Sequence, residues 1–234
     1  MARKRTPPKR VKAPATVAEK GPKLRSRSHF EAKWDAVVSA AAKVFARKGF
    51  AATTVDDLMV ATGLQRGGLY HYMSRKEDLL VAIHLRFIEP LLAEAERIDI
   101  EVQDPTEAVR QHALALANNL RDYHDEVVVF LAEWRLIRDE AGWEDIRRAR
   151  KDLEHVIERC LRRGAASGQF HIQDTRLATF AFLGMFNYAH QWFDANGRVS
   201  PGDLADNFAG LFIRGISAQS QGQEADAMKE GTRS

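Results

Sequence analysis

The chain has 234 residues, of which 45% are hydrophobic and 29% charged, with a formal net charge of +3 and one cysteine. This composition is ordinary for a globular protein, the length exceeds one typical domain of about 150 residues, and the lone cysteine excludes a disulfide framework and a cysteine-built zinc site. No apolar run approaches the ~18 residues of a membrane helix, and no short apolar segment follows the basic N-terminus as in a secretory signal, so we expect a cytoplasmic protein without a membrane partner.

A basic, proline-rich arm occupies residues 1–27. It holds ten of the 35 lysines and arginines and one of the 32 acidic residues, a charge of +9, whereas residues 28–234 carry 25 basic and 31 acidic residues, a charge of −6. With four of the seven prolines and almost no large apolar side chain, the arm is predicted to be disordered when free. Such an arm suits a polyanion, of which nucleic acid is the commonest; a solvated tail without a partner is the alternative.

Helix signals begin after the arm. Apolar residues between Trp34 and Phe45 recur at the i, i+3, i+4, i+7 spacing of one helix face, and Gly49 is expected to end that helix. One of the two threonines at 53–54 then caps a short helix that ends before Gly63. A second short helix is predicted after the turn that contains this glycine.

Longer helices follow. The sequence Ser-Arg-Lys-Glu at 74–77 is a capping box that opens a helix to about Arg97, and Pro90 within that helix predicts a kink. Apolar periodicity, caps and prolines at first helical positions predict five more helices, over 105–123, 125–140, 143–167, 174–195 and 200–217. Since no sustained strand-like alternation occurs, the sequence predicts an all-α fold of about nine helices. Residues 219–234 are expected to form a frayed, disordered tail.

The clearest chemistry lies in the two short helices around the turn at 62–65. In the second of them, Leu69, Tyr72 and Met73 are spaced to pack inward, which leaves the residues at 66, 67, 70 and 71 on the outer face. Two short helices joined by a turn with a glycine are typical of a helix-turn-helix, whose second helix enters the major groove of DNA. The sequence therefore predicts a DNA-reading surface here.

The residues of that outer face suit DNA. Arg66 can donate two hydrogen bonds to a guanine edge or pair with a phosphate, and Tyr70 and His71 can donate to phosphate oxygens. Gly67 and Gly68 each lower helix propensity by about 1 kcal/mol relative to alanine, which favours a need for close approach to DNA. Taken singly, Tyr70 and His71 would each more often be an ordinary half-buried helix residue than a DNA contact, but their combination at this spacing favours DNA binding.

Residues 49–80, GFAATTVDDLMVATGLQRGGLYHYMSRKEDLL, resemble the signature of the TetR family of transcriptional regulators. The resemblance implies a homodimer that binds an operator in double-stranded DNA. It also implies a helix-turn-helix domain over 28–75 and a larger helical ligand-binding and dimerisation domain over 76–218. The positions that match family DNA contacts are Thr54, Arg66, Gly67, Gly68, Tyr70, His71 and Lys76.

Three positions depart from the family signature. Gln65 stands where serine or threonine usually caps the recognition helix, so this cap is expected to be weaker. Met59 replaces a small alanine and Met73 a phenylalanine, which implies altered packing behind the helix. Asp56 and Asp57 are expected to repel phosphate, so base reading should be concentrated in the second short helix.

The basic arm precedes the predicted DNA-binding domain and is expected to take part in DNA binding. It is predicted to lie in the adjacent minor groove or along the backbone, where each neutralised phosphate adds about 0.9 to the salt slope. Deleting residues 1–27 is expected to weaken binding and flatten its salt dependence while leaving the preferred sequence largely unchanged. An unchanged salt slope would contradict this role.

The larger domain supplies aromatic residues as the lining of an effector pocket. Aromatic residues at helical spacing more often form core than pocket, but the resemblance implies a cavity among these helices. The expected lining comprises Phe87, Phe130, Trp134, Phe182 and Phe186, together with Trp143 and Tyr188. Arg135 and Arg138 are either surface charges or partners of an anionic effector.

A second resemblance covers residues 184–216 and concerns TetR members that respond to acyl-CoA thioesters. It rests on Trp192, Gly197 and the Gly215-Ile216 end of the last helix, and it implies an acyl-CoA or other lipid-like small-molecule effector. The last two predicted helices also combine small with large apolar residues, which fits either a four-helix dimer interface or burial within one chain. The dimer is favoured because two operator half-sites about 34–36 Å apart need two recognition helices, one from each chain.

The predicted function is that of a ligand-responsive repressor, in which effector and operator bind different states of the dimer and weaken each other equally. Activation is the alternative consequence of DNA binding.

An enzyme is not favoured, because nucleophile-elbow, phosphate-loop and His-Glu-x-x-His motifs are absent, and no catalytic residue, cofactor or metal site is expected. Cys160 is expected to be a buried apolar residue. A DNA-packaging protein is the remaining rival, since a regulator keeps its operator against excess competitor DNA and a packaging protein does not.

Overall fold

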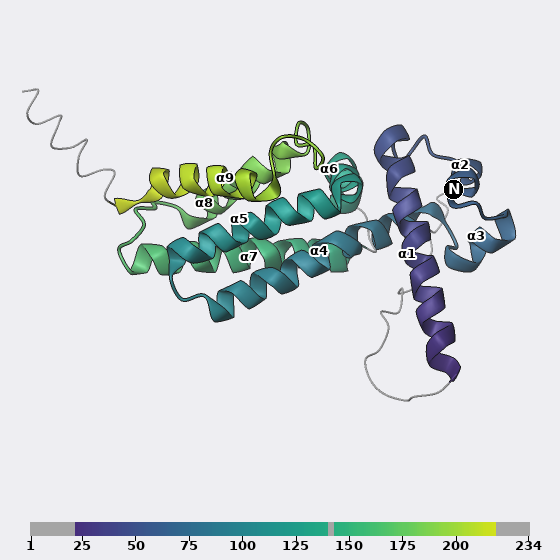
Figure 1. Cartoon of the computed structure of the whole chain (residues 1–234), viewed down its shortest axis with the longest axis horizontal. Helices are drawn as coiled ribbons and strands as arrows, with labels where there is room; N and C mark the ends of the chain where they lie inside the picture. The colour runs from purple at the N-terminus through teal and green to yellow at the C-terminus, as the bar shows by residue number, and fades with distance from the viewer. Residues whose placement is uncertain (1–21, 140–142, 219–234) are drawn as a thin grey trace, which may run out of the picture. The chain divides into compact units, whose positions relative to one another are not determined.

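The computed structural model describes the backbone of residues 22–139 and 143–218 and the side chains of 30–134 and 143–218. These residues form nine helices: α1 (Pro22–Lys48), α2 (Val55–Thr62), α3 (Arg66–Tyr72), α4 (Lys76–Glu101), α5 (Pro105–Asp122), α6 (His124–Asp139), α7 (Glu144–Ala166), α8 (Thr175–Ala189) and α9 (Pro201–Ile216) (Figure 1). The only strand-like pairing among the described residues is an isolated bridge between Phe170 and Ser217. The predicted all-α fold is confirmed.

The chain divides into two compact units. Of the described residues, the first unit contains those up to Phe87 together with those between 125 and 147, and the second contains 88–124 together with 148–218. The helix-turn-helix of α2 and α3 therefore shares a unit with α1, the first half of α4 and α6. The ligand-binding domain expected over 76–218 is distributed over both units.

In the first unit, α1 packs against α2, and α2 packs against α3. The predicted apolar face of α1 is confirmed, because its residues Val37, Val38, Ala41 and Phe45 are buried and Trp34 is half-buried. Gly49 follows α1 with a φ of +81°, the left-handed backbone that glycine adopts most readily. The helix begins at Pro22, so residues 22–27 are helical, whereas the sequence placed them in a disordered arm; residues 1–21 and the tail 219–234 lie outside the described residues.

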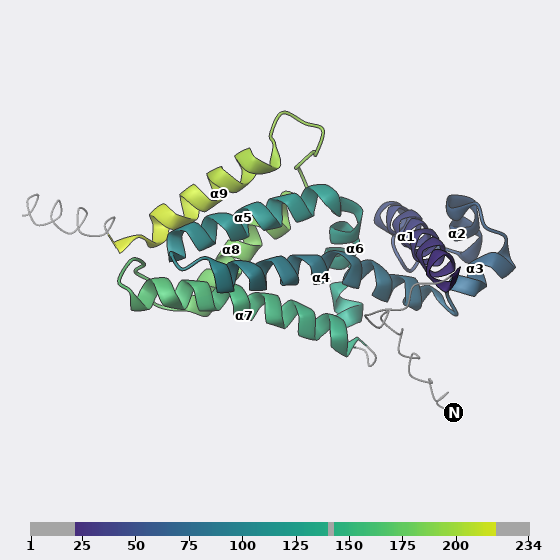
Figure 2. The same cartoon turned by 60° about the horizontal axis from the view of Figure 1, so that its bottom comes forward.

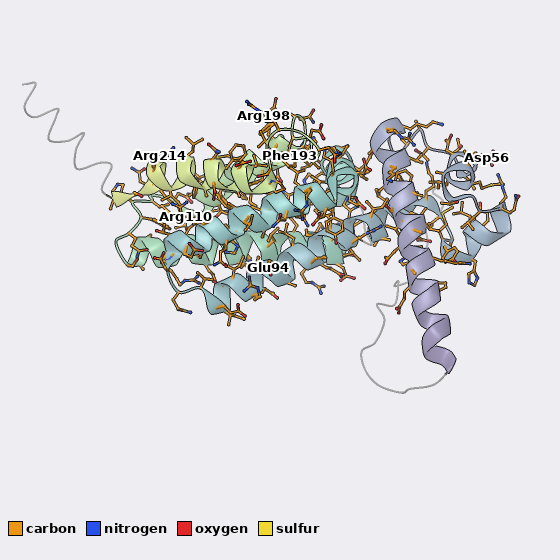
Figure 3. The ribbon with its side chains drawn as sticks, in the orientation of Figure 1. Asp56, Glu94, Arg110, Phe193, Arg198 and Arg214 are labelled. Atoms are coloured by element: carbon orange, nitrogen blue, oxygen red, sulfur yellow. The ribbon has the colours of Figure 1, made fainter. Side chains whose placement is uncertain are left out.

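Two predicted helix ends need correction. At the start of α4, Asp78 Oδ2 accepts the N–H groups of Ser74 (2.8 Å) and Arg75 (3.1 Å), so the capping acid lies one residue beyond the expected one. α8 ends at Ala189 rather than at residue 195, because the N–H of Trp192 turns back to the carbonyl of Ala189 (3.1 Å). Phe193, labelled in Figure 3, is buried beyond this end, and its apolar side chain extended the apparent helical period.

In the second unit, α5 packs along α9 and also contacts α8, as Figures 1 and 2 both show for α5 and α9. Asp99 at the end of α4 holds α7 by accepting hydrogen bonds from Arg159 (2.8 and 2.9 Å) and from Arg163. Cys160 of α7 is fully buried, and its thiol donates to the carbonyl of Pro105 (3.6 Å), so the interpretation of this residue as a core residue is confirmed.

Candidate DNA-binding surface and aromatic clusters

The inner side of α3 fixes the helix against α1. Leu69 and Met73 are buried as predicted, with 0% and 2% of their surface exposed. Tyr72 stacks on Phe30 and Trp34, with ring centroids 5.3 and 6.2 Å apart. These contacts determine which residues of α3 can face a partner.

The predicted outer face of α3 lies in solvent. Arg66, Gly67, Tyr70 and His71 are all exposed, and the Tyr70 side chain retains 47% of its accessible surface. The ring of His71 meets that of Phe30 edge-on, with centroids 5.9 Å apart, so the exposed imidazole also has a contact with α1. Side chains that can donate hydrogen bonds to bases and phosphates therefore share one accessible surface.

The two glycines of α3 are not required by packing within the chain. Among the described residues, a Cβ atom at Gly67 would meet no atom within 4 Å, and one at Gly68 would touch Leu64 at 3.8 Å, an ordinary contact. Both helical positions would therefore accept alanine, which has the higher helix propensity. Their lack of a side chain leaves space above the helix for a closely approaching partner.

The acidic residues beside this surface form ion pairs with basic side chains. The Asp56 carboxylate, labelled in Figure 3, accepts a hydrogen bond from Arg66 (3.0 Å), and that of Asp57 accepts one from Lys48 (2.6 Å). The Lys48 ammonium, together with the Thr54 hydrogen bonds, holds the pKa of Asp57 well below its usual range. Because Arg66 and Asp56 are both largely exposed, their ion pair is weak and can exchange for a phosphate or a base.

Thr54 is the N-cap of α2, as one of the two sequence alternatives had it. Its hydroxyl accepts the N–H of Asp57 (3.2 Å), and the Asp57 carboxylate accepts the backbone N–H of Thr54 (2.7 Å), which together form a capping box; the hydroxyl also donates to this carboxylate (2.7 Å). Gln65 caps α3 without a side-chain hydrogen bond, so the weaker cap predicted for the recognition helix is confirmed. The hydroxyl of Thr54 is thus already engaged in positioning α2.

Lys76 is placed differently from the sequence prediction. Its ammonium donates to the carbonyls of Phe50 (2.8 Å) and Thr53 (2.7 Å) and lies 4.7 Å from the centre of the Phe50 ring. The side chain is half-buried and ties the start of α4 to the loop between α1 and α2. Its charge thereby stabilises the junction between this loop and α4, and the predicted phosphate contact of Lys76 stays a prediction.

The predicted pocket residues fall into two groups, one in each unit. In the first unit, Phe130 packs against Phe87 and Trp134, with centroids 5.2 and 5.6 Å apart, and the cluster also contains His84, which the sequence analysis did not single out. Trp143 is buried and meets the same histidine. We call these five residues the His84 cluster.

The second group lies between α8 and α9. Phe182 and Phe186 are buried and 5.4 Å apart, and they pack against Phe212 and Phe208 respectively. Tyr188, which the sequence predicts among the lining residues, is 69% exposed, because it lies on the opposite side of α8 from the buried pair. The side chains of residues 135 and 138, the two arginines of α6, lie outside those described.

No metal-binding group of three or more histidine, cysteine or acidic side chains occurs in the described part of the chain. Over the same residues, none of the helices combines the length and the apolar character that crossing a membrane requires. The candidate functional features of the described residues are thus an exposed hydrogen-bonding surface on α3 and two buried aromatic clusters.

Comparison with known sequences decides the family. Residues 37–83, which contain α2 and α3, match the model of the bacterial regulatory proteins of the tetR family, and residues 102–216 match that of the tetracyclin repressor-like C-terminal domain. The chain belongs to the TetR family of transcriptional regulators. It is therefore a DNA-binding regulator, and α3 is the recognition helix of its TetR helix-turn-helix.

Individual relatives agree with this assignment. The HTH-type transcriptional repressor KstR2 of Mycolicibacterium smegmatis is 24% identical over 191 residues, which cover 81% of this chain and 93% of KstR2. The crystal structure of the TetR family regulator PfmR from Thermus thermophilus has 32% sequence identity and a TM-score of 0.69, covering 76% of this chain and 97% of PfmR. The crystal structure of AibR in complex with isovaleryl coenzyme A and operator DNA is similar in fold, with 23% identity, a TM-score of 0.69 and coverage of 76% and 97%.

Proposed function

We propose that this TetR regulator is a dimeric repressor, which holds its operator through α3 and releases it when a small apolar or acyl-CoA-like effector binds. The observation that carries the proposal is the exposed outer face of α3, where donor side chains flank two glycines that no packing contact requires. Two such faces in a dimer meet two half-sites of one operator.

The dimer is supported by an apolar face that a single chain leaves uncovered. On α8, Leu177, Phe180 and Tyr188 are 65%, 41% and 69% exposed, and the small residues Ala181 and Gly184 are exposed at the same helical spacing. On α9, Leu211 is 58% exposed. Large apolar residues interspersed with small ones let two helix pairs approach closely, as in a four-helix interface.

The effector class is supported by the second resemblance, over residues 184–216, and by the fold shared with AibR, whose crystal structure contains isovaleryl coenzyme A. A thermal-shift series with acyl-CoA thioesters tests it, because a ligand that binds only the folded chain raises the melting temperature by mass action. We expect the same compounds to release operator DNA, since effector and operator are linked reciprocally.

The DNA-binding role is tested with a duplex selected from a random pool by the full-length protein. We expect Arg66→Ala and Tyr70→Ala to weaken binding of that duplex by tenfold or more, since a good contact to a base contributes about 1–3 kcal/mol. Lys151→Ala, which removes an exposed positive charge on α7, is the matched control and should leave affinity nearly unchanged. Undiminished affinity of both α3 variants, or loss of the selected duplex to random competitor DNA, would refute a sequence-reading regulator.

A further inference from the structure

We propose that His84 is the polar anchor of the effector site, accepting a hydrogen bond from a hydroxyl or N–H group of a ligand whose apolar body packs against Phe130, Phe87 and Trp143. The inference rests on the proposed function, because it locates the effector site within the first unit and states which functional group the effector must have.

The site is built by three segments of the first unit. His84 lies on α4 and is 0% exposed, and its ring centroid lies 5.3 Å from that of Phe130 on α6. The rings of Phe87 and Trp143, which directly precedes α7, are 6.5 and 6.3 Å away. Trp134 extends the cluster beyond Phe130. An imidazole is thus surrounded by aromatic rings.

The tautomer of this imidazole follows from its single hydrogen bond. Nδ1 lies 2.5 Å from the carbonyl oxygen of Leu80, and since a carbonyl only accepts, Nδ1 carries the hydrogen. Nε2 then presents a lone pair, and it has no hydrogen-bond partner among the described residues. Burial lowers the pKa of His84 to about 4, so the ring is neutral at pH 7 and Nε2 remains an acceptor.

An acceptor without a partner in an apolar site selects for a donor. Buried polar atoms in folded proteins are nearly always paired, and a ligand hydroxyl or N–H at Nε2 would supply the missing bond. A ligand carboxylate is disfavoured, because its lone pairs would face the lone pair of Nε2 and its charge would be buried among aromatic rings. An acyl-CoA would meet this requirement through an amide N–H or a hydroxyl, and not through its thioester oxygen.

A second buried histidine provides the matched comparison. His112 on α5 belongs to the second unit, is 2% exposed, and also has an Nε2 atom without a partner among the described residues. Its surroundings differ, because the charges of Asp99, Arg163 and Glu94 act on it. The aromatic cluster is found around His84.

The test compares three probes of one shape by calorimetry on the full-length protein at pH 7: 2-naphthol, which has a donor, 2-methoxynaphthalene, which has none, and 2-naphthoate, which is anionic. We expect 2-naphthol to bind about tenfold more tightly than its methyl ether, the effect of one buried hydrogen bond, and 2-naphthoate to bind most weakly. His84→Phe should abolish the difference between the alcohol and the ether, whereas His112→Phe should retain it.

Equal affinity for 2-naphthol and its ether, binding of none of the three probes, or a preference that survives in His84→Phe would each overturn the site. Circular dichroism verifies that the variants fold. If His84→Phe does not fold, His84→Gln, whose side-chain oxygen can still accept, should retain a preference for the alcohol, and loss of that preference would count against the site. Binding of the selected duplex by the same preparation separates the two ideas, because a chain that keeps its operator but fails this test remains a regulator.

Discussion

Gly67 occupies the second position of α3, on the surface that we propose faces the groove. Because no atom of the described residues lies within 4 Å of a Cβ atom there, Gly67→Ala should raise the free energy of unfolding by up to about 1 kcal/mol through helix propensity. The same methyl group should weaken DNA binding, since it occupies the space of closest approach. Urea unfolding and a gel-shift titration measure the two opposite effects.

The matched control for this substitution is Gly202→Ala. Gly202 is also the second residue of its helix, α9, and a Cβ atom there would make only an ordinary contact with the Ser200 hydroxyl at 3.6 Å. This variant should gain stability in the same way without a change in DNA affinity. If Gly67→Ala also bound DNA as the unmodified chain does, the glycine would have no role in close approach.

Two buried histidines make stability depend on pH. Burial lowers the pKa of both His84 and His112 from 6.5 to about 4. The unfolded chain therefore takes up two protons near pH 6.5 that the folded chain refuses until about pH 4, so stability is fully present above pH 6.5 and is lost as the pH falls through this window. Each histidine should account for about 3 kcal/mol of that loss.

Urea midpoints measured at fixed protein concentration between pH 7 and pH 4.5 test this dependence. His84→Phe and His112→Phe should each remove about half of the histidine contribution to the slope, because the two sites lie in different units and act independently. Replacing the exposed His155 of α7 by glutamine controls for the loss of a histidine as such. A slope that neither buried variant changes would contradict the prediction.

At the scale of elements, α6 is bound directly to the DNA-binding part of the first unit. Glu133 of α6 accepts the N–H of Phe50 (3.2 Å), and Lys76 of α4 donates to the carbonyl of the same residue. The loop between α1 and α2 is thus held by two helices that also carry four of the five residues of the His84 cluster. Since Phe130 and Glu133 lie three residues apart on α6, we expect a ligand in contact with Phe130 to be coupled to the loop that leads into α2.

Removal of this contact is a direct test of the coupling. Glu133→Ala leaves the largely buried N–H of Phe50 without its acceptor, which should lower the free energy of unfolding by about 1–3 kcal/mol and weaken DNA binding. Glu133→Gln retains an acceptor oxygen and should restore most of both properties. Urea unfolding and gel-shift titrations of the two variants measure this, and an alanine variant identical to the unmodified chain would exclude the contact as a link.

Local signals in the sequence were sufficient for most elements. The cap at Thr54, the glycine after α1 and the inward spacing of Leu69 and Met73 all depend on neighbours within a few residues, and all were found. The ends of α4 and α8 were displaced, because Asp78 competes with the residue before it as the capping acid and Phe193 continues the apolar period beyond the helix.

Contacts between distant residues could not be predicted in the same way. Lys76 reaches carbonyls 23 and 26 residues earlier in the chain, and Glu133 reaches an N–H 83 residues earlier. No periodicity encodes such pairs, so the sequence predicts for Lys76 only a DNA contact at the start of α4 and predicts no contact for Glu133. The sequence contains no signal for His84 for a related reason, because only the folded chain shows that its ring lies among aromatic residues with one nitrogen unpaired.

At the scale of the whole molecule, the uncovered face of α8 and α9 determines the oligomeric state that we propose. Phe180→Arg places a charge in the middle of that face and should convert the dimer into a monomer at micromolar concentration, with weaker operator binding as a consequence. Ile100→Arg, at a 74% exposed position of α4, is the control and should leave the dimer intact. Sedimentation velocity distinguishes the species, and a native chain that is monomeric without DNA would contradict the interface.

The burial of Cys160 has a practical consequence for measuring such changes. Its thiol is fully buried, and burial raises its pKa to about 12, so maleimides, which attack thiolates, leave it untouched in the folded protein. Since the chain has no second cysteine, a thiol introduced by Val60→Cys, at an 86% exposed position of α2, becomes the one reactive attachment point for a spin label. Electron-paramagnetic-resonance distances between two labelled protomers then report the spacing of the two α2 helices, and so of the two helix-turn-helix motifs, with and without effector.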